Sequence, residues 1–238
     1  MYAGVFGVMV IVTIISWKYF HGVRNSKYIN RFFSYFCKDP EIFDTGDFYW
    51  TEDFRNNYKE ILEEINSHDK NISSYKNINK ELSCDVEGWK ILFLRVFNKD
   101  TKFAEKFPKT MKLINNCPCV TAYFSLLEPG TKIPPHVGIY KGVIRYHLGL
   151  IVPEKWEQCY INVNMKILHW REGQDLMFDD MFLHYVINNT NEKRLILFLD
   201  IKRNFHNPIL NFINNIFLKF IMINETVNSI VEKTNTQA

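Results

Sequence analysis

The sequence predicts a mainly β fold of the sandwich or barrel type, preceded by helices and by a membrane anchor at the N-terminus. After Gly88, short β-prone runs follow one another without intervening helical segments. These runs are Ile91–Phe97, Val120–Leu127, Val143–Val152, Tyr160–Val163, Asp175–Phe178 and Leu195–Ile201. Turn signals such as Pro129-Gly130 and Glu172-Gly173 separate them. Many short strands of this kind favour a sandwich or barrel over a parallel α/β sheet.

Composition limits the chain to one substantial domain with accessory segments. The chain has 238 residues, of which 47% are hydrophobic. This length is sufficient for one large core and too short for two large domains. A formal net charge of +3 does not indicate a surface for nucleic acid. The five cysteines lack disulfide spacing, so we expect reduced thiols. Cys117-Pro118-Cys119 has no second pair of cysteine ligands, which argues against a metal site there.

The N-terminal run Met1–Trp17 contains no charged side chain. It is near the lower limit for a membrane-spanning helix, and Lys18 can extend it by snorkelling. A cleaved signal peptide is the alternative, but a basic n-region and a clear cleavage site are missing. We therefore predict a single-pass anchor over residues 1–23. Basic residues follow this run and none precedes it, which places the remaining chain on the cytoplasmic face. Potential N-glycosylation triplets begin at Asn71, Asn188 and Asn224, and these would instead indicate the non-cytoplasmic side.

The segments on either side of the β region, which we place at residues 88–205, have helical patterns. Residues 24–87 are predicted to form a helical and loop region that packs on the core, with Phe54, Tyr58, Ile61, Leu62 and Ile65 on one helix face. Residues 206–238 are predicted to form an amphipathic helix and a polar tail. The helix, Pro208–Ile223, is expected to dock on the domain or to lie on the membrane.

Three of the seven histidines lie in contexts that suggest chemistry. His136 follows Pro134-Pro135, His147 lies within a predicted strand, and His184 comes shortly after Asp179-Asp180. An isolated histidine is usually a surface residue or a satisfied core residue. The surrounding motifs, and not the residue type, therefore carry the functional prediction.

The stretch from Ser125 to Arg203 resembles the aspartyl/asparaginyl β-hydroxylase family, which includes bacterial lipid A 2-hydroxylases. The resemblance covers about a third of the chain as an ordered series of motifs. The matching segments are Ser125–His136, Val143–Leu150, Trp170–Asp180, Met181–His184 and Arg194–Asp200. A looser match, Gly88-Trp89-Lys90, precedes the first strand. Trp170 and Phe178 are interpreted as core aromatic residues.

This resemblance implies a double-stranded β-helix, or jelly roll, that uses iron(II) and 2-oxoglutarate. His136 and His184 would hold the metal, and they are 48 positions apart, so only the fold can bring them together. Arg194 with the hydroxyl of Ser125 would bind the far carboxylate of 2-oxoglutarate. The residues that would contact the metal-chelating end of this cofactor are Arg145 and His147.

One position departs from the usual iron site of two histidines and a carboxylate. Gly138 stands two residues after the first histidine, where the carboxylate is normally found. In this respect the chain resembles the protein β-hydroxylases, in which water replaces that ligand, more than the lipid hydroxylases. Asp180 is the candidate catalytic acid that orients this water or completes the coordination itself. The alternative is that Asp179-Asp180 forms a solvated turn pair.

The predicted reaction is hydroxylation of a substrate coupled to decarboxylation of 2-oxoglutarate to succinate. The missing carboxylate ligand favours a protein Asp or Asn side chain, whereas the short anchor and compact size favour a lipid acyl chain. A membrane-anchored, catalytically inactive jelly-roll binding module is the main alternative, and the retained histidines, arginines and Ser125 argue against it. A zinc hydrolase on the same histidines lacks a third protein ligand and explains neither arginine.

Overall fold

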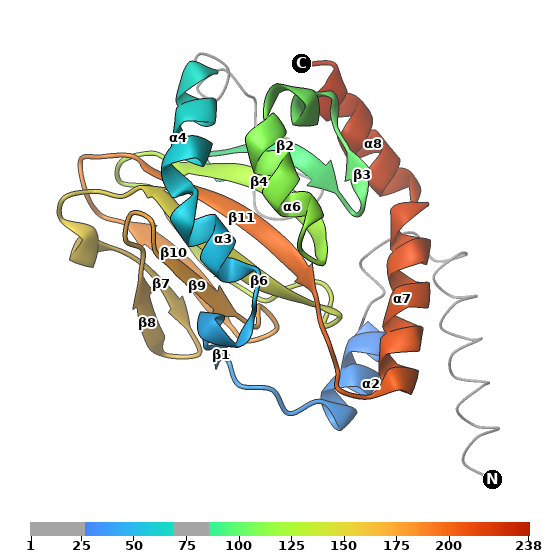
Figure 1. The fold of residues 1–238 in the computed structure, drawn as a ribbon. Coiled ribbons are helices and arrows are strands. Elements are labelled where there is room, and N and C mark those ends of the chain that lie inside the picture. Colours follow the sequence, from blue (N-terminus) through green and yellow to red (C-terminus); the bar gives the residue numbers. More distant parts are fainter. Residues whose placement is uncertain (1–26, 69–85) are drawn as a thin grey trace, which may run out of the picture.

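Two antiparallel β-sheets form the centre of the computed structural model, which describes residues 27–68 and 86–238 (Figure 1). The larger sheet contains, in spatial order, β1 (Ile42–Phe43), β9 (Asp175–Phe178), β6 (Val143–Ile151), β11 (Arg194–Lys202), β4 (Cys119–Leu127), β2 (Trp89–Val96) and β3 (Lys99–Asp100). The smaller sheet contains β5 (Lys132–His136), β10 (His184–Asn188), β7 (Cys159–Val163) and β8 (Lys166–His169).

Strands β4 to β11 wind as a double-stranded β-helix. The chain passes from one sheet to the other, so that β4, β6, β9 and β11 lie in the larger sheet and β5, β7, β8 and β10 lie in the smaller one. Two facing four-stranded layers connected in this way form a jelly roll. The predicted mainly β, jelly-roll class is therefore confirmed, and β1, β2 and β3 extend the larger sheet.

The apolar runs predicted the larger sheet better than the smaller one. All six predicted runs are strands, and five of them, β2, β4, β6, β9 and β11, belong to the larger sheet. Strands β5, β8 and β10 of the smaller sheet were not predicted. Strand β5 includes Pro134 and Pro135, and it lies at the edge of its sheet, where proline is tolerated.

Helices cover the outer face of the larger sheet. They are α3 (Thr51–Asn56), α4 (Tyr58–Ser67) and α6 (Pro108–Asn115), and Figure 1 shows them lying across this sheet. Alternate residues of β11 divide between two cores, because successive side chains of a strand point to opposite faces. Leu197 packs under these helices, whereas Phe198 packs between the two sheets. Of the residues predicted on one helix face, Phe54, Ile61 and Ile65 are buried, but the face is divided between two helices, with Phe54 on α3 and the others on α4.

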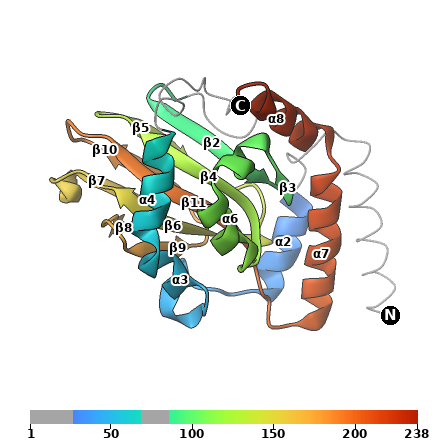
Figure 2. The same cartoon turned by 45° about the horizontal axis from the view of Figure 1, so that its top comes forward.

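Three further helices stand at the end of the fold that is most distant from the smaller sheet, as Figure 2 shows: α2 (Lys27–Phe36), α7 (Pro208–Met222) and α8 (Glu225–Asn235). Short 3-10 helices lie at η2 (Thr45–Asp47), η4 (Lys102–Lys106) and η5 (Trp156–Gln158). The residues after Asn224, predicted as a polar tail, form a further helix. Asn224 caps α8 by accepting a hydrogen bond from the Thr226 amide, and Val227 and Ile230 are buried.

The membrane predictions fall largely outside the described residues. No helix within residues 27–68 and 86–238 is both long and apolar enough to cross a bilayer. The predicted anchor at residues 1–23 lies outside these ranges, and so does residue 84 with its thiol. The anchor, the cytoplasmic orientation and the boundaries at residues 24–87, 88–205 and 206–238 stay predictions.

Candidate active site

Strand pairing brings the two predicted metal histidines together. His136 ends β5 and His184 begins β10, and the two residues are direct partners in the register of the smaller sheet. Their ring centroids are 4.1 Å apart. Two residues that are 48 positions apart in the sequence therefore become neighbours in space because β5 pairs with β10.

Both imidazoles are held in the same tautomer by their own backbone. Nδ1 of His136 lies 2.8 Å from the Pro134 carbonyl oxygen, and Nδ1 of His184 lies 2.9 Å from the Phe182 carbonyl oxygen. A carbonyl oxygen only accepts, so Nδ1–H donates and the lone pair remains on Nε2. A hydrogen bond of this kind is the usual way in which proteins orient a metal-binding histidine.

Burial keeps both rings neutral at physiological pH. It lowers the pKa of His136, and it lowers the pKa of His184 to about 4, with the neighbouring His136 as the second cause. A metal ion binds the neutral form of imidazole. The pair is therefore in the protonation state that a metal site requires.

A buried acid occupies the space that a side chain at position 138 would take. A Cβ built on Gly138 would lie 2.0 Å from Oδ2 of Asp180. The same Oδ2 accepts a hydrogen bond from Arg145 Nε at 2.8 Å and forms an ion pair with Arg145 Nη2 at 2.6 Å. Oδ1 of Asp180 has no hydrogen-bond partner within the described part of the chain. The carboxylate thus stands where the missing ligand position would project, with one oxygen available.

The alternative of a solvated turn pair is wrong, because Asp179 and Asp180 are both fully buried. Asp179 forms ion pairs with Lys141 and with Arg203 and accepts a hydrogen bond from the Met181 amide. Arg203 also forms an ion pair with a carboxylate that precedes β1, Asp39. This network fixes the segment that leads to His184, and the sequence did not reveal it.

A fully buried guanidinium lies on the larger sheet without a counter-ion. Arg194 is 1% exposed, and its Nη2 donates to Ser125 Oγ at 3.2 Å. Its guanidinium carbon lies 4.6 Å from the centre of the Trp170 ring. Among the described residues no carboxylate pairs with Arg194, and its Nε has no acceptor. Burial lowers the pKa of Arg194 to about 10. A buried, unpaired cation is costly, so this site is suited to an anionic ligand.

The Ser125 hydroxyl is arranged to donate to such a ligand. Its oxygen accepts hydrogen bonds from Trp89 Nε1, at 3.0 Å, and from Arg194. With two donors directed at this oxygen, the hydroxyl hydrogen is left for a further acceptor. Trp89 was not predicted as a site residue. Its buried indole N–H, which needs an acceptor, is the signal that identifies it.

His147 offers a second donor on the same wall. Its Nδ1 accepts a hydrogen bond from Trp170 Nε1 at 3.3 Å, so Nε2 carries the hydrogen. This Nε2 is buried and has no partner in the described ranges. Burial first, and then the charge of Arg194, holds the pKa of His147 well below its usual value. Trp170, interpreted from the sequence as a core aromatic, therefore positions both His147 and Arg194.

Arg145 is matched by two carboxylates. It pairs with Asp180 and, at 3.3 Å, with Asp200 on β11. Burial raises the pKa of Asp200 to about 6. Arg145 thus fixes Asp180 in place, a contact that the sequence did not predict, and its side chain remains 21% exposed.

The donor set fits iron(II) with open coordination positions. In residues 27–68 and 86–238, no cluster of three or more His, Cys, Asp or Glu side chains forms a complete metal site. A metal at His136 and His184 would need oxygen ligands from a cofactor and water, as non-haem iron does. Zinc sites normally have at least three protein ligands, which argues against the zinc hydrolase.

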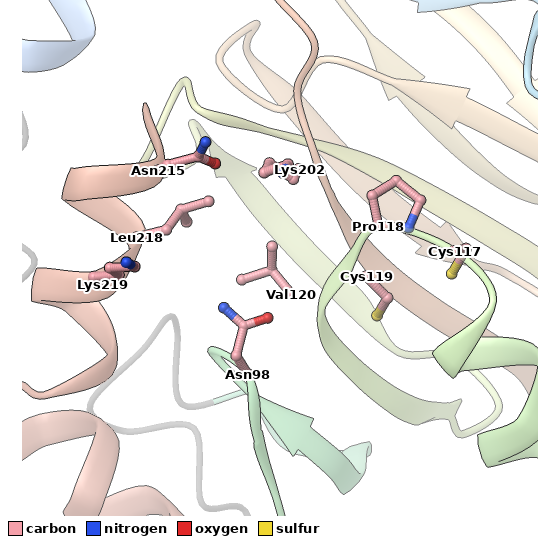
Figure 3. Close-up of a pocket in the computed structure, with 9 residues that line it drawn as sticks. All are labelled: Asn98, Cys117, Pro118, Cys119, Val120, Lys202, Asn215, Leu218 and Lys219. Carbon is pink, nitrogen blue, oxygen red and sulfur yellow. The ribbon is translucent and has the colours of Figure 1, made fainter. Parts of the chain in front are cut away.

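A separate cavity of about 420 Å³ lies between α7 and the start of β4 (Figure 3). It is lined by Asn98, Cys117, Pro118, Cys119, Val120, Lys202, Asn215, Leu218 and Lys219. None of the predicted site residues is among them. The four cysteines in the described ranges are free thiols, in agreement with the sequence.

Comparisons with known proteins identify the family and relatives of this chain. The profile of the aspartyl/asparaginyl beta-hydroxylase family matches residues 55–204. An ornithine lipid ester-linked acyl 2-hydroxylase of Rhizobium tropici is 35% identical over 71% of this chain and 63% of its own length. The human aspartyl/asparaginyl beta-hydroxylase is 36% identical over 43% of this chain.

The chain spans only part of these relatives, 63% of the bacterial protein and 13% of the human one. Among solved structures, a prolyl-4-hydroxylase of Pseudomonas putida superimposes with a TM-score of 0.41 at 14% identity, over 63% of this chain and 88% of that chain. The family profile covers well over half of the 238 residues. The chain belongs to the aspartyl/asparaginyl β-hydroxylase family.

Proposed function

We propose that this protein is an iron(II)- and 2-oxoglutarate-dependent hydroxylase. The observation that supports it most strongly is the unpaired, buried Arg194 on β11, whose charge acts on His147 of the neighbouring strand β6, as does the ring of His184. A cation in that position fits the far carboxylate of a dicarboxylic acid whose other end reaches the metal. A protein that only bound another macromolecule would have no use for this charge.

Each residue has a defined part in this proposal. His136 and His184 would hold iron(II), which when bound supplies the activation of dioxygen. Arg194 and Ser125 would bind the far carboxylate, and the Nε2–H of His147 would donate to an oxygen at the near end. Asp180, held by Arg145, would orient a water molecule beside the histidines. The packed aromatic residues around them exclude bulk water.

The test is iron-dependent succinate formation from 2-oxoglutarate by the full chain, measured with and without added ferrous iron. His184→Ala should abolish turnover. His206→Asn is the matched control, because His206 is exposed, lies outside the site and has a φ of 53° that asparagine tolerates. Wild-type protein that binds neither ferrous iron nor 2-oxoglutarate would instead support the inactive binding module.

We propose a lipid acyl chain as the substrate. Val137 follows His136 and Leu183 precedes His184, and these apolar side chains are 53% and 55% exposed beside the two metal ligands. An apolar rim at this place suits a hydrocarbon chain better than a charged peptide. The name of the Rhizobium relative, an acyl 2-hydroxylase, agrees with this choice.

The second candidate substrate is an Asp or Asn side chain of a protein. Gly138 in place of a carboxylate ligand and the names of the human and mouse relatives favour it. Mass spectrometry can separate the two by following the gain of one oxygen atom in membrane lipids and in acidic peptides. Leu183→Asp should lower lipid hydroxylation while leaving the affinity for 2-oxoglutarate unchanged. Equal loss on both substrate classes would contradict an acyl-binding rim.

A further inference from the structure

Helix α7 has apolar side chains on the side that faces away from the protein, beside the exposed Asn215 and Lys219, as well as on the side that faces the core. Leu210, Ile213, Phe217 and Ile221 are buried. On the outward side, Ile209, Phe212 and Ile223 are 62 to 64% exposed. A helix that packs on a soluble domain normally has polar residues on its outer side. The outward stripe of α7 therefore has the composition of a contact surface without a described contact.

Helix α2 has a similar outward stripe. Tyr28, Tyr35 and Phe36 are 53 to 77% exposed, whereas Ile29 and Phe33 are buried. Figures 1 and 2 both show α2 beside α7 at the same end of the molecule. The Phe33 ring stacks on the ring of Phe205, just before α7, with centroids 4.4 Å apart. The two helices also bury residues in the same core cluster, among them Phe33 of α2 and Leu210 of α7.

The charges on these helices have one sign. Neither α2 nor α7 contains an acidic residue. Lys27 and Arg31 are exposed on α2, and Lys219 is exposed on α7. Exposed aromatic and aliphatic side chains together with basic groups are typical of helices that lie in the headgroup region of an anionic bilayer.

We propose that the outward stripes of α2 and α7 lie on the surface of a bilayer that contains anionic lipids. The charge complementarity supports this occupant, and so does the position of the stripes along the chain. The uncharged run Met1–Trp17, predicted as an anchor, ends ten residues before α2 begins at Lys27. A membrane that receives this run would lie close to the start of α2.

This contact would also fix the active site relative to the membrane. Asn30 of α2 donates to the Ile139 carbonyl at 2.8 Å and accepts from the Lys141 amide at 2.9 Å. Both partners lie in the loop that follows His136. Bilayer docking through α2 would therefore hold the first metal histidine at a set position from the lipid, whatever substrate is hydroxylated.

The test uses the full chain with a single fluorescent label that reports the polarity around it. In a background with Cys84→Ser and Cys117→Ser, the label is attached at Phe212→Cys or, as a second α7 site, at Ile223→Cys. Tyr49→Cys is the matched control, since Tyr49 is an aromatic residue that is 84% exposed and lies between η2 and α3. Vesicles contain equal parts of phosphatidylcholine and phosphatidylglycerol, and a second set contains phosphatidylcholine alone.

The proposal predicts a blue shift and brighter emission at both α7 sites when the mixed vesicles are added, with no change at Tyr49→Cys. Arg31→Glu with Lys219→Glu should weaken vesicle binding several-fold. Bound protein without a shift at α7, or no vesicle binding, would overturn the proposal. A blue shift that is already present without vesicles would also overturn the proposal. It would indicate that residues 1–26 cover α7 or, if the shift depends on protein concentration, that a second copy of the chain covers it. None of these readouts depends on hydroxylation, so the proposed function is tested separately.

Discussion

The two sheets of the jelly roll differ in burial and in the chemistry they carry. All nine residues of β4 and eight of the nine in β11 are buried in the larger sheet, whereas no residue of β8 is buried in the smaller one. The larger sheet holds Ser125, His147 and Arg194, and the smaller sheet holds His136 and His184. The predicted anion-binding groups thus stand on the larger sheet, which we call the rigid wall, and the predicted metal ligands stand on the more exposed smaller sheet, which we call the open wall.

The largest difference between the sheets should appear in stability. Leu197→Ala removes a fully buried side chain under the covering helices, and we expect a loss of about 2–5 kcal/mol in the free energy of unfolding. Ile187→Ala in β10 truncates a half-buried side chain and should cost about 1 kcal/mol. Urea denaturation measures both. Equal losses would show that the two sheets are comparably rigid.

The charges on the inner wall of the larger sheet should make stability depend on pH. Asp200 has a pKa raised from 3.8 to about 6, so the folded state binds its proton more tightly than the unfolded state. Its contribution to stability is therefore present at low pH and lost as the pH rises from about 4 to about 6.

Relative to Asp200→Asn, the wild-type free energy of unfolding should fall by roughly 1–3 kcal/mol across this window. Denaturation at several pH values, with the two proteins compared at each, isolates this group from the other acids. A difference that stays constant with pH would show that the carboxylate is already ionised in the folded protein at low pH.

Metal binding at the open wall should be sensitive to substitution of Gly138, which lies two residues after β5. Gly138→Ala places a Cβ where the Asp180 carboxylate now lies, and Arg145 restrains that carboxylate from moving. We expect iron(II) affinity to fall about 10–100-fold, as when a group that orients a metal ligand is disturbed. Gly130→Ala is the control for backbone strain without a steric clash, since its φ of 72° strains an alanine while nothing lies within 4 Å of the added Cβ. Unchanged affinity in Gly138→Ala would remove Asp180 from the metal site.

The sequence predicted the rigid wall better than the open one for a physical reason. Strands buried on both faces read as continuous apolar runs, as in Leu195–Leu199 of β11, whereas β5 and β8 are short and half-exposed. The family motifs identified His136, His184, Ser125 and Arg194. Trp89, Asp200 and the Arg203 network could not be predicted, because their roles arise from contacts such as Trp89 with Ser125, 36 positions apart.

In the proposed function, Arg194 is buried without a carboxylate partner because its charge binds 2-oxoglutarate. Arg203 is the matched comparison, because it is equally buried but paired with Asp39 and Asp179. Replacing either arginine by methionine removes a positive charge of similar size from the interior. Only for Arg203 does the change remove a cation from carboxylates: Asp179, which is fully buried and keeps Lys141 as its other partner, and Asp39, which is partly buried.

The decisive measurement is calorimetric titration of 2-oxoglutarate into wild type, Arg194→Met and Arg203→Met, with thermal denaturation of each protein. Arg194→Met should lose about 2–5 kcal/mol of binding free energy without losing stability. Arg203→Met should lose about 3–5 kcal/mol of stability. Two results would contradict the proposal: an Arg194→Met protein that binds 2-oxoglutarate as tightly as the wild type does, or one that is destabilised as much as Arg203→Met.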